Sequence, residues 1–248
     1  MNLLYPEIEG LINLLESAKK EGLRRVILVG CFSSVAGGVY RKEYNESHWA
    51  DPDKCDIQER VRYFVEKTAW FYVKQHEKHF DFSVFLPTLM IGPLNKKTES
   101  TESIIFLEKL AENKYQKLME TMLGFVDVRD VAWQIVESLD SEKTFSGRYI
   151  LSQGTYWLEE IFKTIHQDNQ APTIEKPGIV GKFVLRFLSL FDSSAKKILE
   201  FHGKNYKIED EKAKGDLGVH YRRLDESIAD TLQSLQSFDR ISANFHRL

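Results

Sequence analysis

The chain has few of the residues that mark secreted or metal-binding proteins. Only two cysteines, Cys31 and Cys55, are present, with no Cys-x-x-Cys pair and no histidines at metal-ligand spacing. The sequence therefore predicts neither a disulfide framework nor a zinc site. The N-terminus, MNLLYPEIEG, has acidic residues where a signal peptide needs a basic and then an apolar run. A reducing, cytoplasmic location is the simplest expectation.

A long apolar run and an excess of one charge are also missing. The most apolar stretch, IVGKFVLRFLSLF, is interrupted by Lys182 and Arg186 and is shorter than the ~20 residues of a membrane span. We expect it to form an amphipathic or buried helix. The 34 basic and 37 acidic residues give a net charge of -3, which favours neither nucleic acid nor an anionic membrane as a partner.

The residues that are present predict an α/β fold. Apolar positions at helical spacing indicate a helix that ends at Gly22, and the run Val26 to Val29 is apolar on both faces, as in a buried strand of a parallel sheet. A long helix over 55–78 and the apolar strand FDFSVFLP follow. Helix and strand alternate in the rhythm of a parallel sheet with helical crossovers.

Beyond Pro93 the pattern changes to shorter elements. The polar loop NKKTESTES leads to a helix near 101–119, the segment GFVDV, a helix starting around Asp130 and the strand GRYIL. Thr155 is the expected N-cap of the next helix. The segment 167–178 is expected to be a loop, and LDESIADTLQSLQ the final helix.

Several pieces of the chain, in order, resemble the extended short-chain dehydrogenase/reductase family, in the branch of dihydroflavonol reductases, cinnamoyl-CoA reductases and related carbonyl reductases. They are EGLINLLESAKKEGLRRVIL, NESHWADPDK, EKTAWFYVKQH, FDFSVFLPTLMIGP, FVDVRDVAWQIV, GRYILS and EDEKAKGDLGVHYRRLDESIADT. The resemblance implies the later half of a Rossmann-like parallel sheet in residues 1–98. It implies a mostly helical α/β substrate or lid region with short strands in residues 99–248.

The resemblance also shows a difference at the start of the chain. The family opens with a strand, a Gly-rich turn and a helix, and the turn glycines let backbone amides approach the cofactor pyrophosphate. No such turn occurs here, because GCFSSVAGG follows the later strand and lacks the spacing. The resemblance therefore implies an N-terminally truncated chain with reduced affinity for NAD or NADP.

The family's catalytic Ser, Tyr and Lys correspond to other residues in this chain. The resemblance places Cys31 at the Ser position. One alignment takes Tyr63 and Lys67 as the Tyr and Lys, and requires about a turn of helix to be deleted before FDFSVF. The other runs nearly ungapped from EKTAWFYV and places Gln58 at the Tyr position and Arg62 at the Lys position. We favour the second alignment.

Helix geometry supports the same choice. At about 100° per residue, one apolar stripe should face the sheet. The stripe contains Val61, Phe64, Val65, Thr68, Ala69 and Tyr72. Gln58 and Arg62 lie on its flank, whereas Tyr63 and Lys67 lie on the opposite side and are expected to face outward. In many family members this helix, here 55–78, is a dimerisation element.

The substituted positions change the chemistry that the resemblance implies. Gln58 cannot titrate and so cannot be a general acid, a loss that typically costs ~10²–10⁴ in rate. Arg62 keeps a charge able to hydrogen-bond a ribose or carboxylate but is no proton relay. Cys31 is expected to be a small, buried apolar residue at a strand end. Pro87 and Leu89 correspond to the turn whose backbone holds the nicotinamide amide, although a purely structural turn remains an equal alternative.

Two functions are expected from these residues. One is a catalytically impaired NAD(P)-dependent carbonyl reductase relative, a pseudoenzyme that acts as a binding or dimerising partner, as a homodimer or with an intact paralogue. The alternative is an active oxidoreductase on a ketone, aldehyde or CH–OH group that uses Tyr63 and Lys67, with the cofactor half missing from this gene model or supplied by another chain. A third possibility is a misfolding fragment with an exposed apolar edge. Asp127 and Asp130 are expected to cap and pack a helix.

Overall fold

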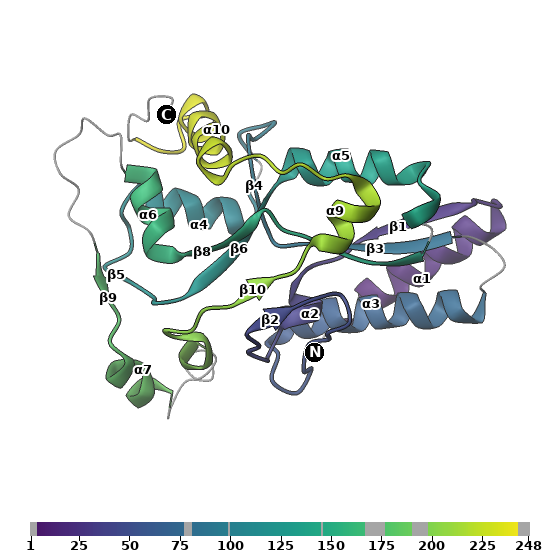
Figure 1. Ribbon diagram of the computed structural model, residues 1–248, viewed down its shortest axis with the longest axis horizontal. Helices are drawn as coiled ribbons and strands as arrows, with labels where there is room; N and C mark the ends of the chain where they lie inside the picture. Colours follow the sequence, from purple (N-terminus) through teal and green to yellow (C-terminus); the bar gives the residue numbers. More distant parts are fainter. Residues whose placement is uncertain are drawn as a thin grey trace. The chain divides into compact units, whose positions relative to one another are not determined.

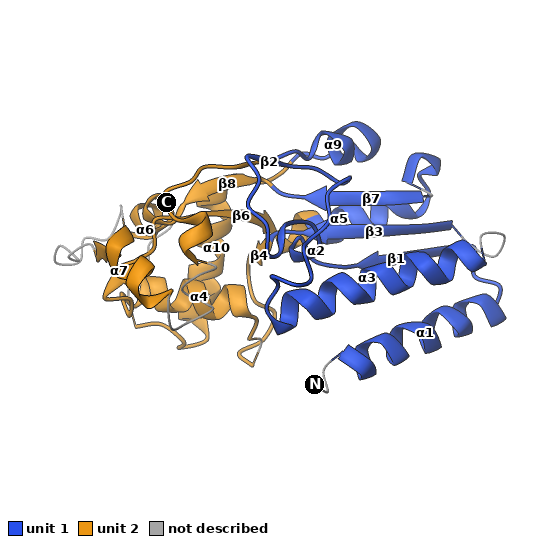
Figure 2. Cartoon of the chain, turned by 90° about the horizontal axis from the view of Figure 1, so that it is seen from below, with its two compact units in different colours: residues 1–88, 131–152, 208–220 blue, residues 89–130, 153–207, 221–248 orange. Residues whose placement is uncertain are grey.

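The computed structural model describes residues 4–76, 81–98, 100–144, 146–166, 177–189 and 198–242. The chain forms two compact units, shown in Figure 2. Unit 1 contains residues 1–88, 131–152 and 208–220, and unit 2 contains residues 89–130, 153–207 and 221–248. The units interleave along the chain. The sequence divides the chain near residue 98 into a Rossmann-like part and a substrate or lid region. This division by role stays a prediction.

Unit 1 is built on a parallel sheet in the order β1-β3-β7. Its strands are β1 (Arg25–Val29), β3 (Asp81–Pro87) and β7 (Ser146–Leu151). The helices α1 (Leu4–Lys20) and α3 (Ile57–Gln75) cover one side of this sheet, and α5 (Val128–Leu139) covers the other (Figure 1). The central strand β3 is buried from Phe82 to Pro87, as its uninterrupted apolar run predicts. The predicted α/β fold is confirmed.

Shorter elements complete unit 1. They are α2 (Ser33–Ala36), β2 (Glu43–Tyr44), the 3₁₀ turn η1 (Glu142–Thr144), β10 (Lys207–Ile208) and α9 (Glu211–Leu217). Next to β10, the amide of Glu209 donates to the carbonyl of Tyr44 at 2.8 Å. This hydrogen bond ties the late segment 208–220 to β2.

Gly38, in the turn after α2, is a position where glycine is required. Its φ is +69°, and a Cβ there would lie 2.8 Å from the carbonyl oxygen of Asp51. We predict that Gly38→Ala lowers the free energy of unfolding by more than the ~1–2 kcal/mol that the left-handed backbone alone costs. Gly10→Ala is the matched control, because a Cβ at this helical position meets nothing within 4 Å and should stabilise α1 by ~1 kcal/mol. Urea unfolding measures both; equal midpoints would contradict the prediction.

Unit 2 packs helices against a mixed sheet. Its strands β4 (Leu89–Ile91) and β6 (Met122–Asp127) are parallel, and β8 (Gly154–Trp157) is antiparallel to β6. Its helices are α4 (Glu102–Ala111), α6 (Leu158–His166), α7 (Lys182–Leu188) and α10 (Leu224–Ser237), and β5 (Lys117–Leu118) pairs with β9 (Gly178–Ile179). The most deeply buried core residues are Ile91, Leu107, Leu110, Ala111, Phe125, Ile161, Ile228 and Leu235.

Two sequence predictions in unit 2 need correction. Thr155 is not a helix N-cap, because it pairs with Gly124 inside β8 and α6 begins only at Leu158. The helix expected over 101–119 ends at Ala111. The apolar stretch forms a helix as expected, α7, in which Leu185 is the buried residue. Most of the loop expected over 167–178 lies outside the described residues. No helix in the described ranges has both the length and the apolar content to cross a bilayer.

His166, at the end of α6, predicts a pH dependence of stability. Burial lowers its pKa, although its Nε2–H donates to the Leu110 carbonyl at 3.1 Å. Because the folded-state pKa lies below the unfolded value of ~6.5, the unfolded chain binds this proton first as the pH falls. We expect the free energy of unfolding to decrease below about pH 6.5. His166→Phe should flatten this slope, whereas the exposed control His220→Gln should not. Identical slopes for His166→Phe and the unmodified chain would contradict the assignment.

Candidate functional site

The candidate site in unit 1 begins where β1 ends. The amide of Gly30 donates to the Phe85 carbonyl at 2.8 Å, and the amide of Phe32 donates to the Pro87 carbonyl at 3.0 Å. These bonds continue the parallel pairing beyond β1 and hold Cys31 between them at the carboxyl ends of the strands. Cys31 is a half-buried free thiol. It is thus more accessible than the small buried residue that we expected.

The first turn of α3 is fixed by a capping box. Asp56 accepts from the amide of Glu59 at 2.9 Å, and the Glu59 carboxylate accepts from the amide of Asp56 at 3.1 Å. Gln58 is exposed in this turn. Arg62 follows one turn later, with its side chain 51% exposed and its Nη1 3.9 Å from the Glu7 carboxylate of α1. Because residues four apart share a helix face, Gln58 and Arg62 both lie on the side of α3 toward α1.

Tyr63 and Lys67 do not face outward, which corrects the prediction from the helical stripe. Both are half-buried. The Tyr63 ring meets the Trp49 ring edge-on with centroids 5.9 Å apart, and the Lys67 Nζ lies 3.5 Å from the centroid of the same ring. The Arg148 guanidinium lies 3.7 Å from it. The prediction failed because Tyr63 and Lys67 give this face of α3 a polar pattern in the sequence. In the structure, Trp49 from the loop before α3 covers the face.

Lys67 is thereby held in a desolvated place beside another cation. Burial lowers its pKa, and the charge of Arg148 lowers it further. A lysine with a lowered pKa can mark a functional site. Here the ammonium contacts an indole ring, which is a stabilising cation–π arrangement. The Lys67 ammonium is therefore held against the Trp49 ring.

Next to Lys67, a buried ion pair connects α3 to β7. Glu66 is 1% exposed, and its carboxylate accepts from Arg148 Nε at 2.6 Å and from Arg148 Nη2 at 3.1 Å. Ser34 also donates to this carboxylate, as does the indole N–H of Trp70 at 3.2 Å. Arg148 Nη1 donates to two backbone carbonyls of the loop before α3, each at 2.6 Å. Sequence reasoning missed this network, although EKTAW and GRYILS both carry the family resemblance.

The predicted stripe of α3 is confirmed in part. Val61, Ala69 and Tyr72 are buried, whereas Phe64, Val65 and Thr68 are half-buried. The buried side of α3 therefore also contains Glu66, which a stripe predicted from apolar residues alone leaves out.

Asp127 and Asp130, in unit 2, have the predicted structural roles. Asp127 is fully buried before α5 and accepts from the amide of Arg129 at 2.8 Å and from its Nε at 2.9 Å. Burial opposes the ionisation of Asp127, but the hydrogen bonds from Arg129 outweigh it and hold the pKa of this carboxyl below its usual range. Asp130 accepts from the amide of Arg222 at 2.8 Å. The prediction that these residues cap and pack a helix is confirmed.

Pro87 and Leu89 have different neighbours. Pro87 is buried at the end of β3, in register with Leu151 of β7. Leu89 begins β4 and packs, partly buried, against the core of unit 2. Their contribution to a cofactor site stays a prediction.

Comparison with known proteins identifies the relatives of the chain. No protein-family model matches it. It is 24% identical over 269 residues to NADPH-dependent methylglyoxal reductase GRE2 of Saccharomyces cerevisiae, covering 96% of this chain and 72% of that protein. It is 28% identical over 244 residues to cinnamoyl-CoA reductase CAD2 of Medicago truncatula, covering 94% and 67%. The chain is a relative of the extended short-chain dehydrogenases/reductases.

A solved structure supports the fold of this reductase relative. The yeast methylglyoxal/isovaleraldehyde reductase Gre2, complexed with NADPH, superposes with a TM-score of 0.72 over 97% of this chain and 72% of that one, at 21% identity. At this identity the likeness shows the fold alone. The Rossmann-like character expected from the sequence is confirmed.

Among the described residues of unit 1, Arg62 has a side chain suited to an NAD(P) cofactor. Arg62 presents an exposed charge that could hydrogen-bond a ribose or phosphate oxygen. Gln58 has no titrating proton, and Lys67 is engaged by Trp49. In the turn after β1, a Cβ on Gly30 would lie 3.0 Å from the Leu86 side chain, so this glycine serves strand packing.

Proposed function

We propose that this NAD(P)-linked reductase relative has lost the proton-transfer step of carbonyl reduction and acts as a binding or dimerising partner. One observation carries the proposal: Gln58 and Arg62 are exposed in the first turns of α3, whereas Tyr63 and Lys67 pack against Trp49. An amide at position 58 cannot donate the proton that a carbonyl oxygen needs during reduction.

The geometry disfavours the alternative, an active reductase that uses Tyr63 and Lys67. To reach a substrate, Lys67 would have to leave Trp49, and its neighbour Glu66 is fixed by Arg148 at 2.6 Å. The relatives' names suggest NADPH as the cofactor and a small carbonyl compound as the ancestral substrate. NADPH in preference to NADH is thus part of the proposal.

Calorimetry of the purified 248-residue chain with NADPH and NADH tests the cofactor part. Circular dichroism must first show that the chain is folded. Micromolar binding without carbonyl-dependent NADPH oxidation is the result expected for a binding-competent pseudoenzyme. Absence of binding by a folded chain would remove cofactor binding from the proposal and leave protein partners alone. Carbonyl-dependent NADPH oxidation would contradict the proposal.

The partner surface that we propose is the exposed part of α3 around Phe71. Phe71 on this helix is 66% exposed, which is typical of a hydrophobic contact residue at an interface. We expect sedimentation of the unmodified chain to show a dimer and Phe71→Asp to convert it to a monomer. Phe183→Asp, at an even more exposed phenylalanine outside α3, is the matched control and should leave the dimer intact. A dimer that survives Phe71→Asp would exclude this surface.

A further inference from the structure

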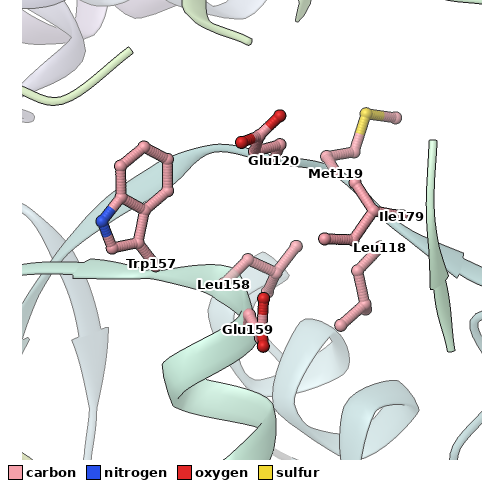
Figure 3. A pocket seen from close by; sticks show the side chains of 7 residues that line it. All are labelled: Leu118, Met119, Glu120, Trp157, Leu158, Glu159 and Ile179. Atoms are coloured by element: carbon pink, nitrogen blue, oxygen red, sulfur yellow. The ribbon is translucent and has the colours of Figure 1, made fainter. Parts of the chain in front are cut away.

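Unit 2 contains a cavity whose lining includes none of the candidate site residues described above. Its volume is about 250 Å³, slightly below the ~300 Å³ at which typical small-molecule sites begin. Figure 3 shows the seven side chains that line it. They come from β5 and the residues after it, from the junction of β8 and α6, and from β9: Leu118, Met119, Glu120, Trp157, Leu158, Glu159 and Ile179.

The walls of this cavity combine an aromatic side, an aliphatic side and polar groups. The indole of Trp157 lies on one side, and Leu118, Met119 and Ile179 lie on the other (Figure 3). Two of the wall segments are held firmly: Leu158 donates its amide to Thr121, and the amide of Val180 donates to Leu118, at 3.0 and 2.9 Å. A preformed cavity with one aromatic wall and aliphatic side chains opposite it suits a ligand with a ring or a compact hydrocarbon part.

The charged groups in the lining are both acidic. Glu120 and Glu159 lie on opposite sides of the cavity in Figure 3, and none of the seven lining residues is basic. Glu120 is oriented by the buried His202, whose Nε2 lies 3.4 Å from its carboxylate. Glu159 pairs with Lys163 at 3.0 Å, and these side chains are 33% and 54% exposed. Because such an exposed pair contributes little, a ligand cation can replace the lysine.

We propose that this cavity binds a small organic amine. The ammonium group would lie between the two carboxylates, and its ring or hydrocarbon part would pack on Trp157, where a cation near the indole face gains a further attraction. Neutral or anionic ligands of the same shape lack these contacts, and an anion would be repelled by both carboxylates. This inference is independent of the function proposed for α3 and of cofactor binding.

Titration of the full chain with 2-phenylethylamine tests the proposal, with 2-phenylethanol and phenylacetate as the neutral and anionic probes of matched shape. The readout is the indole N–H resonance of Trp157 in a two-dimensional NMR spectrum, assigned by its loss in Trp157→Phe. We expect the amine to bind about tenfold or more tightly than the alcohol, and phenylacetate to leave the resonance unmoved.

Variants that keep the shape of the cavity make the test specific for charge. Glu120→Gln combined with Glu159→Gln should abolish the preference for the amine over the alcohol. Glu9→Gln, which removes an exposed carboxylate on α1, is the control and should retain the preference for the amine over the alcohol. Equal affinity for amine and alcohol would overturn the proposal. So would an amine preference that survives the double substitution, or failure of all three probes to shift Trp157 in a folded chain.

Discussion

Replacing Arg148 with methionine is expected to lower the free energy of unfolding by about 3–5 kcal/mol. The guanidinium neutralises Glu66, which is 1% exposed, through two hydrogen bonds. Methionine fills similar space but leaves the carboxylate buried without its counter-charge, and the loss of a buried partner is far more costly than the loss of an exposed one. Thermal and urea unfolding of the variant measure the effect.

Two controls separate this charge effect from a loss of packing. The double variant Glu66→Leu with Arg148→Met removes both charges and should recover part of the lost stability, although two loop carbonyls still lack their donor. Arg62→Met removes an exposed arginine from its distant pair with Glu7 and should change stability by less than ~1 kcal/mol. A double variant as unstable as the sum of its single variants would show that Glu66 and Arg148 are not coupled.

The combined substitution Gln58→Tyr with Arg62→Lys is expected to raise carbonyl-dependent NADPH oxidation by ~10²–10⁴-fold, the usual contribution of a positioned general acid. The two positions share the exposed face of α3, one turn apart. A tyrosine hydroxyl there gains a titrating proton, and a neighbouring lysine lowers its pKa electrostatically. The rate is measured at cofactor concentrations that saturate the site by calorimetry.

Tyr63→Phe in the same background distinguishes the two helix faces. If position 58 carries the new hydroxyl to the substrate, removal of the Tyr63 hydroxyl leaves the rate unchanged, because its ring contact with Trp49 does not need the oxygen. A rate that does not rise at saturating cofactor, or one that falls with Tyr63→Phe, would contradict the assignment of Gln58 and Arg62.

Much of the fold could be predicted because its signals are local. The buried run of β3 and the helical spacing of α1 and α10 each specify an element within one stretch of chain. The start of α6 could not be predicted in this way. The sequence TYWLEEI has the features of an N-capped helix, yet Thr155 pairs with Gly124 in β8, and this distant strand determines the local conformation.

The buried face of α3 illustrates the same limit for the candidate site. A charged residue counts against burial when a helix is considered alone, so the predicted apolar stripe did not include Glu66. Its partner Arg148 lies 82 residues away in sequence, and nothing in the helix itself indicates that a guanidinium will meet it. Once this pair is known, the orientation of Tyr63 and Lys67 toward Trp49 follows, and so does the outward position of Gln58 and Arg62.

The most direct test of the claim that Tyr63 and Lys67 are structural is carbonyl-dependent NADPH oxidation by the unmodified chain and by Tyr63→Phe. Methylglyoxal is the first substrate to use, because a relative is named for its reduction, and circular dichroism of both proteins confirms folding. We predict no oxidation above the uncatalysed rate in either protein. Turnover by the unmodified chain that falls by ~10² or more in Tyr63→Phe would contradict the claim and make Tyr63 the proton donor.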